Sequence, residues 1–129
     1  MDEEQLSALT ARIIGCAYRV AEKLKYGYLE KVYENAMRVE LERCGFKVEQ
    51  QKRVEVRYEG VLVGDYVADL VVEGAVLLEV KTCKEIDDAH CAQCLNYLHA
   101  TGLPCGLVIN FGPSVKVKRF RNFHRNPSL

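Results

Sequence analysis

Two Glu-Gly pairs divide the middle of the chain into three strand-like segments, and this arrangement constrains the fold most. The pairs are Glu59-Gly60 and Glu73-Gly74. Glycine in a two-residue link favours a hairpin, because glycine accepts a positive φ without steric cost. Apolar residues in this region also leave the helical spacing of the segments before it. The sequence therefore predicts an antiparallel meander of strands over residues 46–58, 61–72 and 76–82.

Helical patterns precede this meander. Apolar residues recur at spacings of three and four over residues 4–24, which predicts an amphipathic helix. Gly27 interrupts the pattern as a hinge or C-cap. A second helix is predicted over about residues 28–44, with Gly45 as its terminating glycine.

A third helix is predicted after the meander, over residues 87–101, with Asp87 or Asp88 as its N-cap. Two strands follow, over residues 105–111 and 115–123. A helix that joins the third and fourth strands makes that pair parallel through a right-handed crossover. A chain of 129 residues fits one domain. We therefore predict a single mixed α/β (α+β) domain spanning residues 1–129, with a central mixed sheet flanked by helices.

The third strand of the meander carries two charges in an apolar setting. Residues 76–81 read Val-Leu-Leu-Glu-Val-Lys, so Glu79 and Lys81 share one strand face with Leu77. Both faces begin with apolar residues, which is typical of a central strand. Charged groups placed there lose hydration, which is costly unless they have a partner.

Asp69 lies on the preceding strand, across the Glu73-Gly74 turn from Glu79. Two facing carboxylates repel each other unless a cation lies between them, and hard oxygen ligands suit Mg²⁺ or Mn²⁺. Lys81 can then stabilise a nucleophilic hydroxide or developing phosphate charge, as in a metal-dependent phosphodiesterase. The same spacing also arises by chance, as an exposed Glu–Lys pair on a half-hydrated strand.

Five short blocks of sequence follow one another in order over nearly the whole chain. They are residues 27–33 (GYLEKVY), 63–70 (VGDYVADL), 78–81 (LEVK), 93–98 (QCLNYL) and 106–112 (GLVINFG). Together these blocks resemble the bacterial GxxExxY proteins, a family placed in the PD-(D/E)XK nuclease superfamily.

The resemblance implies a PD-(D/E)XK fold with an αβββαβ core and a site for Mg²⁺ or Mn²⁺. Its metal-binding acids fall on Asp69 and Glu79, and its lysine falls on Lys81. Glu30 matches the helical acid that many superfamily nucleases add to the metal site. Gln93 matches a polar residue on the helix after the lysine strand. The usual proline before the first acid is replaced by Ala68, as is common in this family.

Two of these residues also have structural explanations. Glu30 shares a helix face with Tyr33 and Glu34, and a hydrated glutamate near a helix N-terminus is favoured by the helix dipole. Gln93 fits a helix-surface amide equally well. Tyr33 is assigned to core packing.

The C-terminal part of the chain is basic. All 18 acidic residues precede residue 89, and five basic residues follow it. Cations interleaved with aromatic rings can contact phosphates and bases. The same pattern also fits an edge strand protected by charge. The candidate nucleic-acid-binding residues are Lys116, Lys118, Arg119, Arg121 and Arg125.

The cysteines offer a competing interpretation. Cys91-x-x-Cys94, with His90 and Cys83 nearby, fits part of a zinc or iron–sulfur site. A zinc site usually needs four ligands, however, and this pair lies within a predicted helix. Buried free cysteine is also common in cores.

The sequence thus favours a metal-dependent nuclease, an endo- or exonuclease acting on DNA and less readily on RNA. The alternative is a non-catalytic module that binds nucleic acid or protein on a nuclease fold. By analogy with other small nucleases, a homodimer is possible. The acidic start Met1-Asp2-Glu3-Glu4 is unlike a signal peptide, and no apolar segment is long enough to span a membrane, so we expect a cytoplasmic protein.

Overall fold

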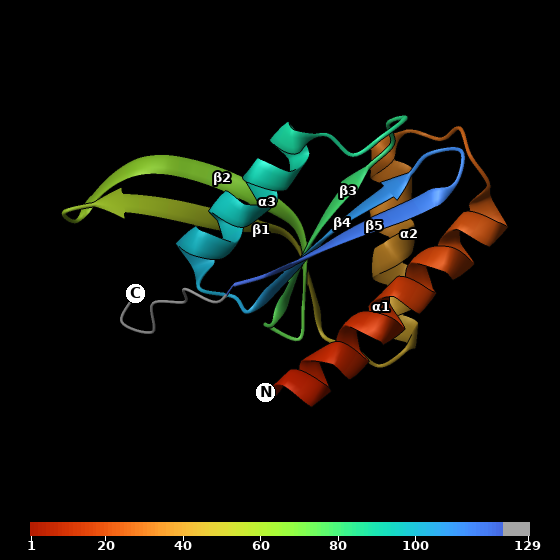
Figure 1. The fold of residues 1–129 in the computed structure, drawn as a ribbon, viewed down its shortest axis with the longest axis horizontal. Coiled ribbons are helices and arrows are strands. Elements are labelled where there is room, and N and C mark those ends of the chain that lie inside the picture. Colours follow the sequence, from red (N-terminus) through yellow and green to blue (C-terminus); the bar gives the residue numbers. More distant parts are fainter. Residues whose placement is uncertain (123–129) are drawn as a thin grey trace.

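A computed structural model describes residues 1–122. In chain order, its elements are α1 (Glu3–Leu24), α2 (Glu30–Arg43), β1 (Val48–Tyr58), β2 (Val61–Val72), β3 (Val76–Lys81), α3 (Asp88–Thr101), β4 (Cys105–Phe111) and β5 (Val115–Arg121). The strands form one sheet in the order β1-β2-β3-β4-β5 (Figure 1). β3 and β4 are parallel, and the other neighbours are antiparallel. The predicted fold class is confirmed.

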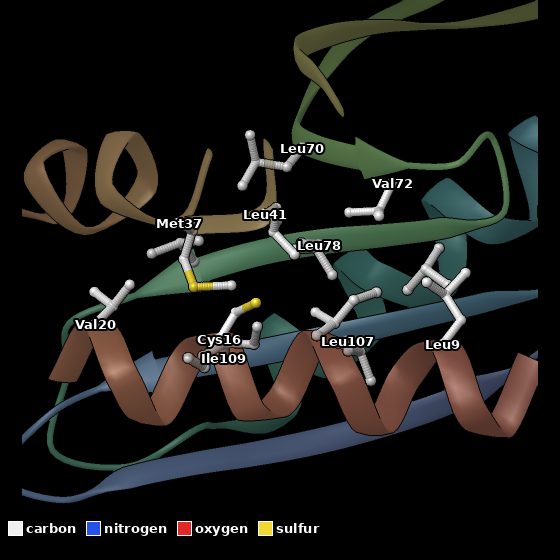
Figure 2. Packing of buried hydrophobic residues seen from close by; sticks show 14 of the residues in the cluster. Leu9, Cys16, Val20, Met37, Leu41, Leu70, Val72, Leu78, Leu107 and Ile109 are labelled. Atoms are coloured by element: carbon white, nitrogen blue, oxygen red, sulfur yellow. The ribbon is translucent and has the colours of Figure 1, made fainter. Parts of the chain in front are cut away.

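The helices cover the two faces of the sheet. α1 and α2 pack on one face, and α3 packs on the other (Figure 1). On the first face, Leu9 and Cys16 of α1 and Met37 of α2 lie against Leu78 and Ile109 of the central strands (Figure 2). The alternation predicted for residues 76–81 holds, because Leu78 belongs to this cluster whereas Leu77 packs under α3. Among the described residues, no helix is long and apolar enough to cross a membrane.

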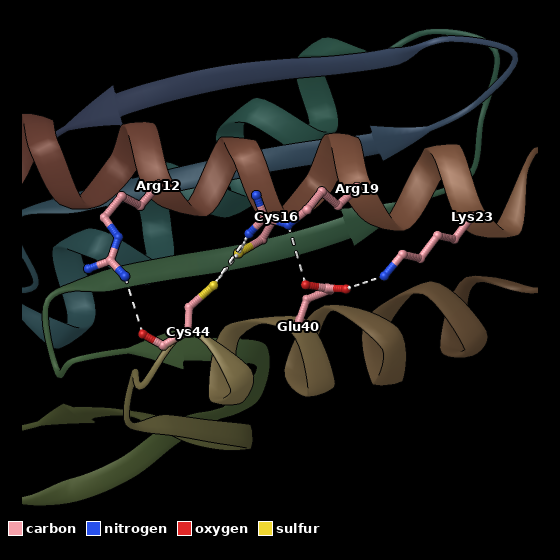
Figure 3. Close-up of polar contacts among 6 residues, drawn as sticks. All are labelled: Arg12, Cys16, Arg19, Lys23, Glu40 and Cys44. Carbon is pink, nitrogen blue, oxygen red and sulfur yellow. Dashed lines mark hydrogen bonds and ion pairs between the residues drawn. The ribbon is translucent and has the colours of Figure 1, made fainter.

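Polar contacts at the surface link α1 to α2 (Figure 3). Arg19 and Lys23 of α1 both pair with Glu40 of α2, at 3.4 and 3.3 Å. The sulfurs of Cys16 and Cys44 lie 3.7 Å apart, and burial raises the pKa of Cys16 to about 11. Exposed ion pairs contribute little to stability, so the apolar cluster beneath them holds α2 against the sheet.

The segment between α1 and α2 differs slightly from the prediction. α1 ends at Leu24, and Lys25 rather than Gly27 occupies its C-cap, with a φ of 64°. α2 begins at Glu30, two residues later than predicted, and its N-cap Leu29 supplies no side-chain hydrogen bond. Glu30 is therefore the first residue of α2. The last predicted strand ends at a position beyond the described residues.

The β1–β2 hairpin separates from the rest of the sheet. β2 pairs with β3 only between residues 70–72 and 76–78, whereas β1 and β2 stay paired to the turn after Tyr58. The hairpin therefore extends past β3, with α3 beside it (Figure 1). Gln51 interrupts the β1–β2 ladder opposite Asp69, with a φ of 54°. This separation leaves the end of β3, from Glu79 to Lys81, without a β2 neighbour.

We expect Gly106→Ala to destabilise the fold. Gly106 of β4 lies under α3, and a methyl group there would come within 2.7 Å of Cys94 Sγ and 3.3 Å of Leu98. Overpacking of this kind costs about 1–3 kcal/mol of unfolding free energy, measurable by urea denaturation. Gly15→Ala is the matched control. A methyl group at Gly15 in helix α1 would lie 3.7 Å from the Arg19 side chain, an ordinary contact. Alanine in place of glycine within a helix stabilises by up to ~1 kcal/mol. Equal stability of Gly106→Ala and the unmodified protein would contradict the packing described.

Candidate active site

Asp69 lies where β2 parts from β3. Its carboxylate takes the place of a strand partner, because Oδ2 accepts a hydrogen bond from the backbone N–H of Val80 at 2.7 Å. The same carboxyl group shares a hydrogen bond with Glu79. Burial raises the pKa of Asp69, although the bond from Val80 opposes that shift. The two acids that the sequence placed across the turn are therefore in contact.

Glu79 is the most strongly perturbed acid in the described structure. It is only 3% exposed, and its Oε1 has no hydrogen-bond partner among the described residues. Burial raises its pKa to about 9, and the neighbouring Asp69 adds to the shift. With no cation bound, the Glu79 carboxyl group is thus protonated at neutral pH. It can then donate a hydrogen bond to the Asp69 carboxylate. A buried acid with an orphaned oxygen is a candidate ligand for a cation.

Lys81 extends from the same strand face as Glu79, two residues further along β3. Its Nζ donates a hydrogen bond to Gln93 Oε1 of α3 at 3.4 Å. Gln93 Nε2 in turn donates to Tyr97 Oη at 3.2 Å. The positive charge of Lys81 acts to lower the pKa of both Glu79 and Asp69. Asp69, Glu79, Lys81 and Gln93, all singled out from the sequence, therefore form one group.

Glu30 faces this group from the start of α2. The residue as a whole is exposed, but packing around its carboxyl group raises its pKa, while the charge of Lys81 acts to lower it. Within residues 1–122, no three acidic, histidine or cysteine side chains gather closely enough to hold a metal ion by themselves. Glu30 is thus near the acid pair without completing a three-ligand group. Asp69 and Glu79 still fit Mg²⁺ or Mn²⁺, because Mg²⁺ usually keeps several waters.

Glu34 is a buried acid whose importance the sequence did not reveal. It is 4% exposed, and its Oε2 accepts hydrogen bonds from Gln50 at 2.6 Å and Gln51 at 2.9 Å. Its charge raises the pKa of Asp69. The only sequence signal was its position four residues after Glu30. Glu34 therefore fixes α2 to the irregular part of β1 and adds negative charge behind the acid pair.

The basic residues of β5 divide between the two faces of the sheet. Arg119 donates to Thr10 Oγ1 at 3.2 Å, and Arg121 forms an ion pair with Glu3, so both contact α1. Lys116 and Lys118 are exposed and, by strand alternation, point to the opposite face. That face carries Glu79 and Lys81. Two of the predicted nucleic-acid contacts thus share the acid pair's face, and Arg125 lies outside the described residues.

The strand register fixes where these lysines lie. Glu79 neighbours Val108, which neighbours Lys118, and Lys81 neighbours Asn110, which neighbours Lys116. Two strand spacings amount to about 10 Å. Lys118 therefore lies at roughly that separation from Glu79 across the sheet, and Lys116 lies at roughly that separation from Lys81.

The thiol-metal interpretation does not fit the structure. Cys94 lies on the buried face of α3 against Gly106 of β4, and burial raises its pKa to about 12. Metals bind the thiolate form, which this environment strongly disfavours. Cys83 instead bonds to Asn110, whose Oδ1 accepts from the Cys83 N–H at 2.9 Å. Asn110 thereby holds the chain just after Lys81.

Comparisons with known proteins agree with this geometry at the level of the family. A model of the PD-(D/E)XK nuclease superfamily matches residues 7–122. The superfamily is therefore confirmed, whereas the finer assignment to the GxxExxY proteins stays a prediction. Curated proteins gave no match. The crystal structure of SSO0001 is similar over 82% of this chain and 61% of that chain, with 15% identity and a TM-score of 0.47. This chain thus spans less than two thirds of that protein.

Proposed function

Because the chain belongs to the PD-(D/E)XK nuclease superfamily, we propose that it hydrolyses phosphodiester bonds at Asp69, Glu79 and Lys81 with Mg²⁺ or Mn²⁺. Membership of this superfamily indicates a nuclease and a nucleic-acid substrate. The observation that supports the site is the buried Glu79, whose Oε1 has no partner among the described residues, in contact with Asp69. DNA is the proposed substrate, with RNA as the less favoured one.

The chain's own residues have distinct tasks in this proposal. Asp69 and Glu79 would hold the cation, and Val80 N–H keeps the Asp69 carboxylate in place. The cation would neutralise the acids and the phosphate and lower the pKa of a water molecule. Lys81 stabilises negative charge that develops on the phosphate, a role suited to an ammonium group held in place by Gln93. Gln93 positions the Lys81 ammonium.

Other residues support binding in the same proposal. Lys116 and Lys118, on the same sheet face, contact neighbouring phosphates of the strand. Glu30, whose pKa responds to the charges of Lys81 and Asp69, would assist the acid pair in holding the cation from the start of α2. Arg119 and Arg121 are engaged with α1, so their contribution to binding is smaller.

We expect Asp69→Asn to abolish cleavage and to remove stabilisation by Mn²⁺. The amide loses the charge that attracts the cation, while it keeps an oxygen to accept from Val80 N–H. Supercoiled plasmid, single-stranded DNA and RNA would each be incubated with Mg²⁺, Mn²⁺ or EDTA. The melting temperature with and without Mn²⁺ reports metal binding independently of activity.

Asp65→Asn is the matched control for this experiment. Asp65 lies on the same strand, is exposed, and pairs with Arg53 at 2.8 Å, away from the acid pair. It should cleave normally and respond normally to Mn²⁺. Cleavage that survives Asp69→Asn, or a protein that cuts none of the substrates with either metal, would refute the proposed activity. Salt-dependent DNA binding that ignores both metal and Glu79→Ala would instead support the non-catalytic module.

A further inference from the structure

A groove lies beside the proposed active site, between the β1–β2 hairpin and α3. Its volume is about 540 Å³. It exists because α3 presents small side chains toward the hairpin where larger ones would close the space. The lining residues are Val56, Tyr66, Ala89, Ala92, Gln93, Asn96, Tyr97, His99 and Ala100.

Two aromatic rings form the walls of the groove. The rings of Tyr66 and Tyr97 have centroids 5.7 Å apart and planes inclined by 42°. Tyr66 on β2 is 49% exposed, so much of its ring surface is uncovered. Gly64 makes room for that ring, because a Cβ at this position would lie 3.0 Å from Tyr66 Cε2 and 3.3 Å from Val56 Cβ. The absence of a side chain at Gly64 thus allows the Tyr66 ring to lie over the backbone at this position.

The chemistry of the lining selects a flat and neutral group. Among residues 1–122, no aspartate, glutamate, lysine or arginine lines the groove. Asn96, His99 and Gln93 offer hydrogen-bonding groups beside the tyrosine rings. Aromatic faces combined with amide groups suit a nucleobase, which stacks through its π face and forms hydrogen bonds along its edge. A phosphate would find no cation in this lining.

One side chain joins the groove to the proposed reaction centre. Gln93 lines the groove, donates to Tyr97 Oη at 3.2 Å and accepts from Lys81 Nζ at 3.4 Å. A base seated in the groove is therefore separated from Lys81 by a single residue. A nucleotide whose phosphate lies at Lys81 can place its base there.

We propose that this groove binds an unpaired base of the nucleic-acid strand next to the phosphate that is cut. This inference rests on the proposed nuclease function and defines its substrate class. A base within a duplex is paired and stacked, and must leave the stack before it can enter a side pocket. The chain therefore acts on single-stranded segments, frayed ends or loops in preference to continuous duplex.

The test compares two short strands that carry the same charge. One is an eight-residue oligothymidylate, and the other is an eight-residue strand of abasic sites. Binding is measured by fluorescence anisotropy in EDTA, so that no cleavage occurs, at one fixed salt concentration. We expect the oligothymidylate to bind about tenfold more tightly, which is within the range for one base–aromatic stack.

Tyr66→Ala should remove most of this difference, because it should weaken binding of the oligothymidylate and leave binding of the abasic strand unchanged. Tyr58→Ala is the matched control, because Tyr58 lies on the same hairpin, is 69% exposed and does not line the groove. Asn96→Ala, at an exposed helix position, provides a second groove variant if the tyrosine variant folds poorly. Gly64→Ala, which crowds the Tyr66 ring, should also reduce the difference.

The outcomes separate this inference from the proposed function. Equal affinity for the two strands, or a difference that Tyr66→Ala and Asn96→Ala both leave intact, would overturn the base-binding groove. Metal-dependent cleavage measured on the same preparations would leave the nuclease proposal standing in that case. A base-dependent difference that needs Tyr66, in a protein that cuts nothing, would support the groove and refute the activity.

Discussion

Lys81→Ala should reduce the rate of nucleic-acid cleavage by roughly 10²–10³-fold, the usual cost of removing one fixed group that stabilises transition-state charge. The loss is expected because the positive charge of the Lys81 ammonium acts on both Asp69 and Glu79. Gln93 accepts a hydrogen bond from this ammonium and so holds it in place. The rate would be measured at saturating Mn²⁺, because loss of this charge also changes the electrostatics of the acid pair.

Lys84→Ala is the control, since Lys84 is an exposed lysine three residues further along the chain. It should retain full activity. The melting temperature of Lys81→Ala should still rise with Mn²⁺, because both acids remain. Activity within tenfold of the unmodified protein would exclude Lys81 from the chemistry, and loss of the Mn²⁺ response would assign it to metal binding instead.

Strand periodicity was enough to predict the face that Glu79 and Lys81 share. The alternation of residues 76–81 is regular, and both faces of β3 are buried as the apolar pattern indicated. The crossover through α3 made β3 and β4 parallel, as predicted. Local signals also limited the N-cap of α3 to Asp87 or Asp88, and the structure shows Asp87 in that role, accepting from His90 N–H. Regular elements with local signals were therefore predictable.

The exact position of Asp69 depended on features that periodicity does not encode. Simple pairing across Glu73-Gly74 places Asp69 directly opposite Glu79. In the structure β2 has left β3 by this point, and the Asp69 carboxylate reaches Val80 N–H instead. The separation accompanies the irregularity at Gln51, whose positive φ has no glycine or asparagine to signal it. The pattern of residue types therefore does not predict this interruption of the β1–β2 ladder.

Burial and groove formation were also out of reach of the sequence. Glu34 looked like an ordinary helix glutamate, and only the packing of α2 on β1 shows that Gln50 and Gln51 enclose it. Alternation along the last strand does imply two faces. It does not reveal that Thr10 and Glu3 of α1 engage the arginines of one face. The burial of Glu34 and the engagement of these arginines both depend on contacts between segments that are distant in the sequence.

Glu79→Gln should stabilise the metal-free protein at neutral and alkaline pH while it abolishes the response to Mn²⁺. Burial raises the pKa of Glu79 from an ordinary value of 4.5 to about 9. The folded protein therefore holds a proton that the unfolded chain releases between these two pH values. Stability falls with rising pH over this range, by at most about 1.4 kcal/mol per pH unit. Glutamine removes this dependence, because its amide is neutral and can donate to Asp69 at every pH.

Urea denaturation in EDTA at pH 5, 7 and 8.5 would measure this effect. We expect Glu79→Gln to match the unmodified protein near pH 5, to exceed its unfolding free energy by on the order of 2 kcal/mol at pH 7, and to exceed it further at pH 8.5. Glu85→Gln, at an exposed position, should follow the unmodified protein throughout. Mn²⁺ should reverse the order, because the carboxylate at position 79 binds a divalent cation together with Asp69 far more strongly than a neutral amide does. A Glu79→Gln protein less stable than the unmodified one at pH 8.5 in EDTA would show that Glu79 is not an uncompensated buried acid.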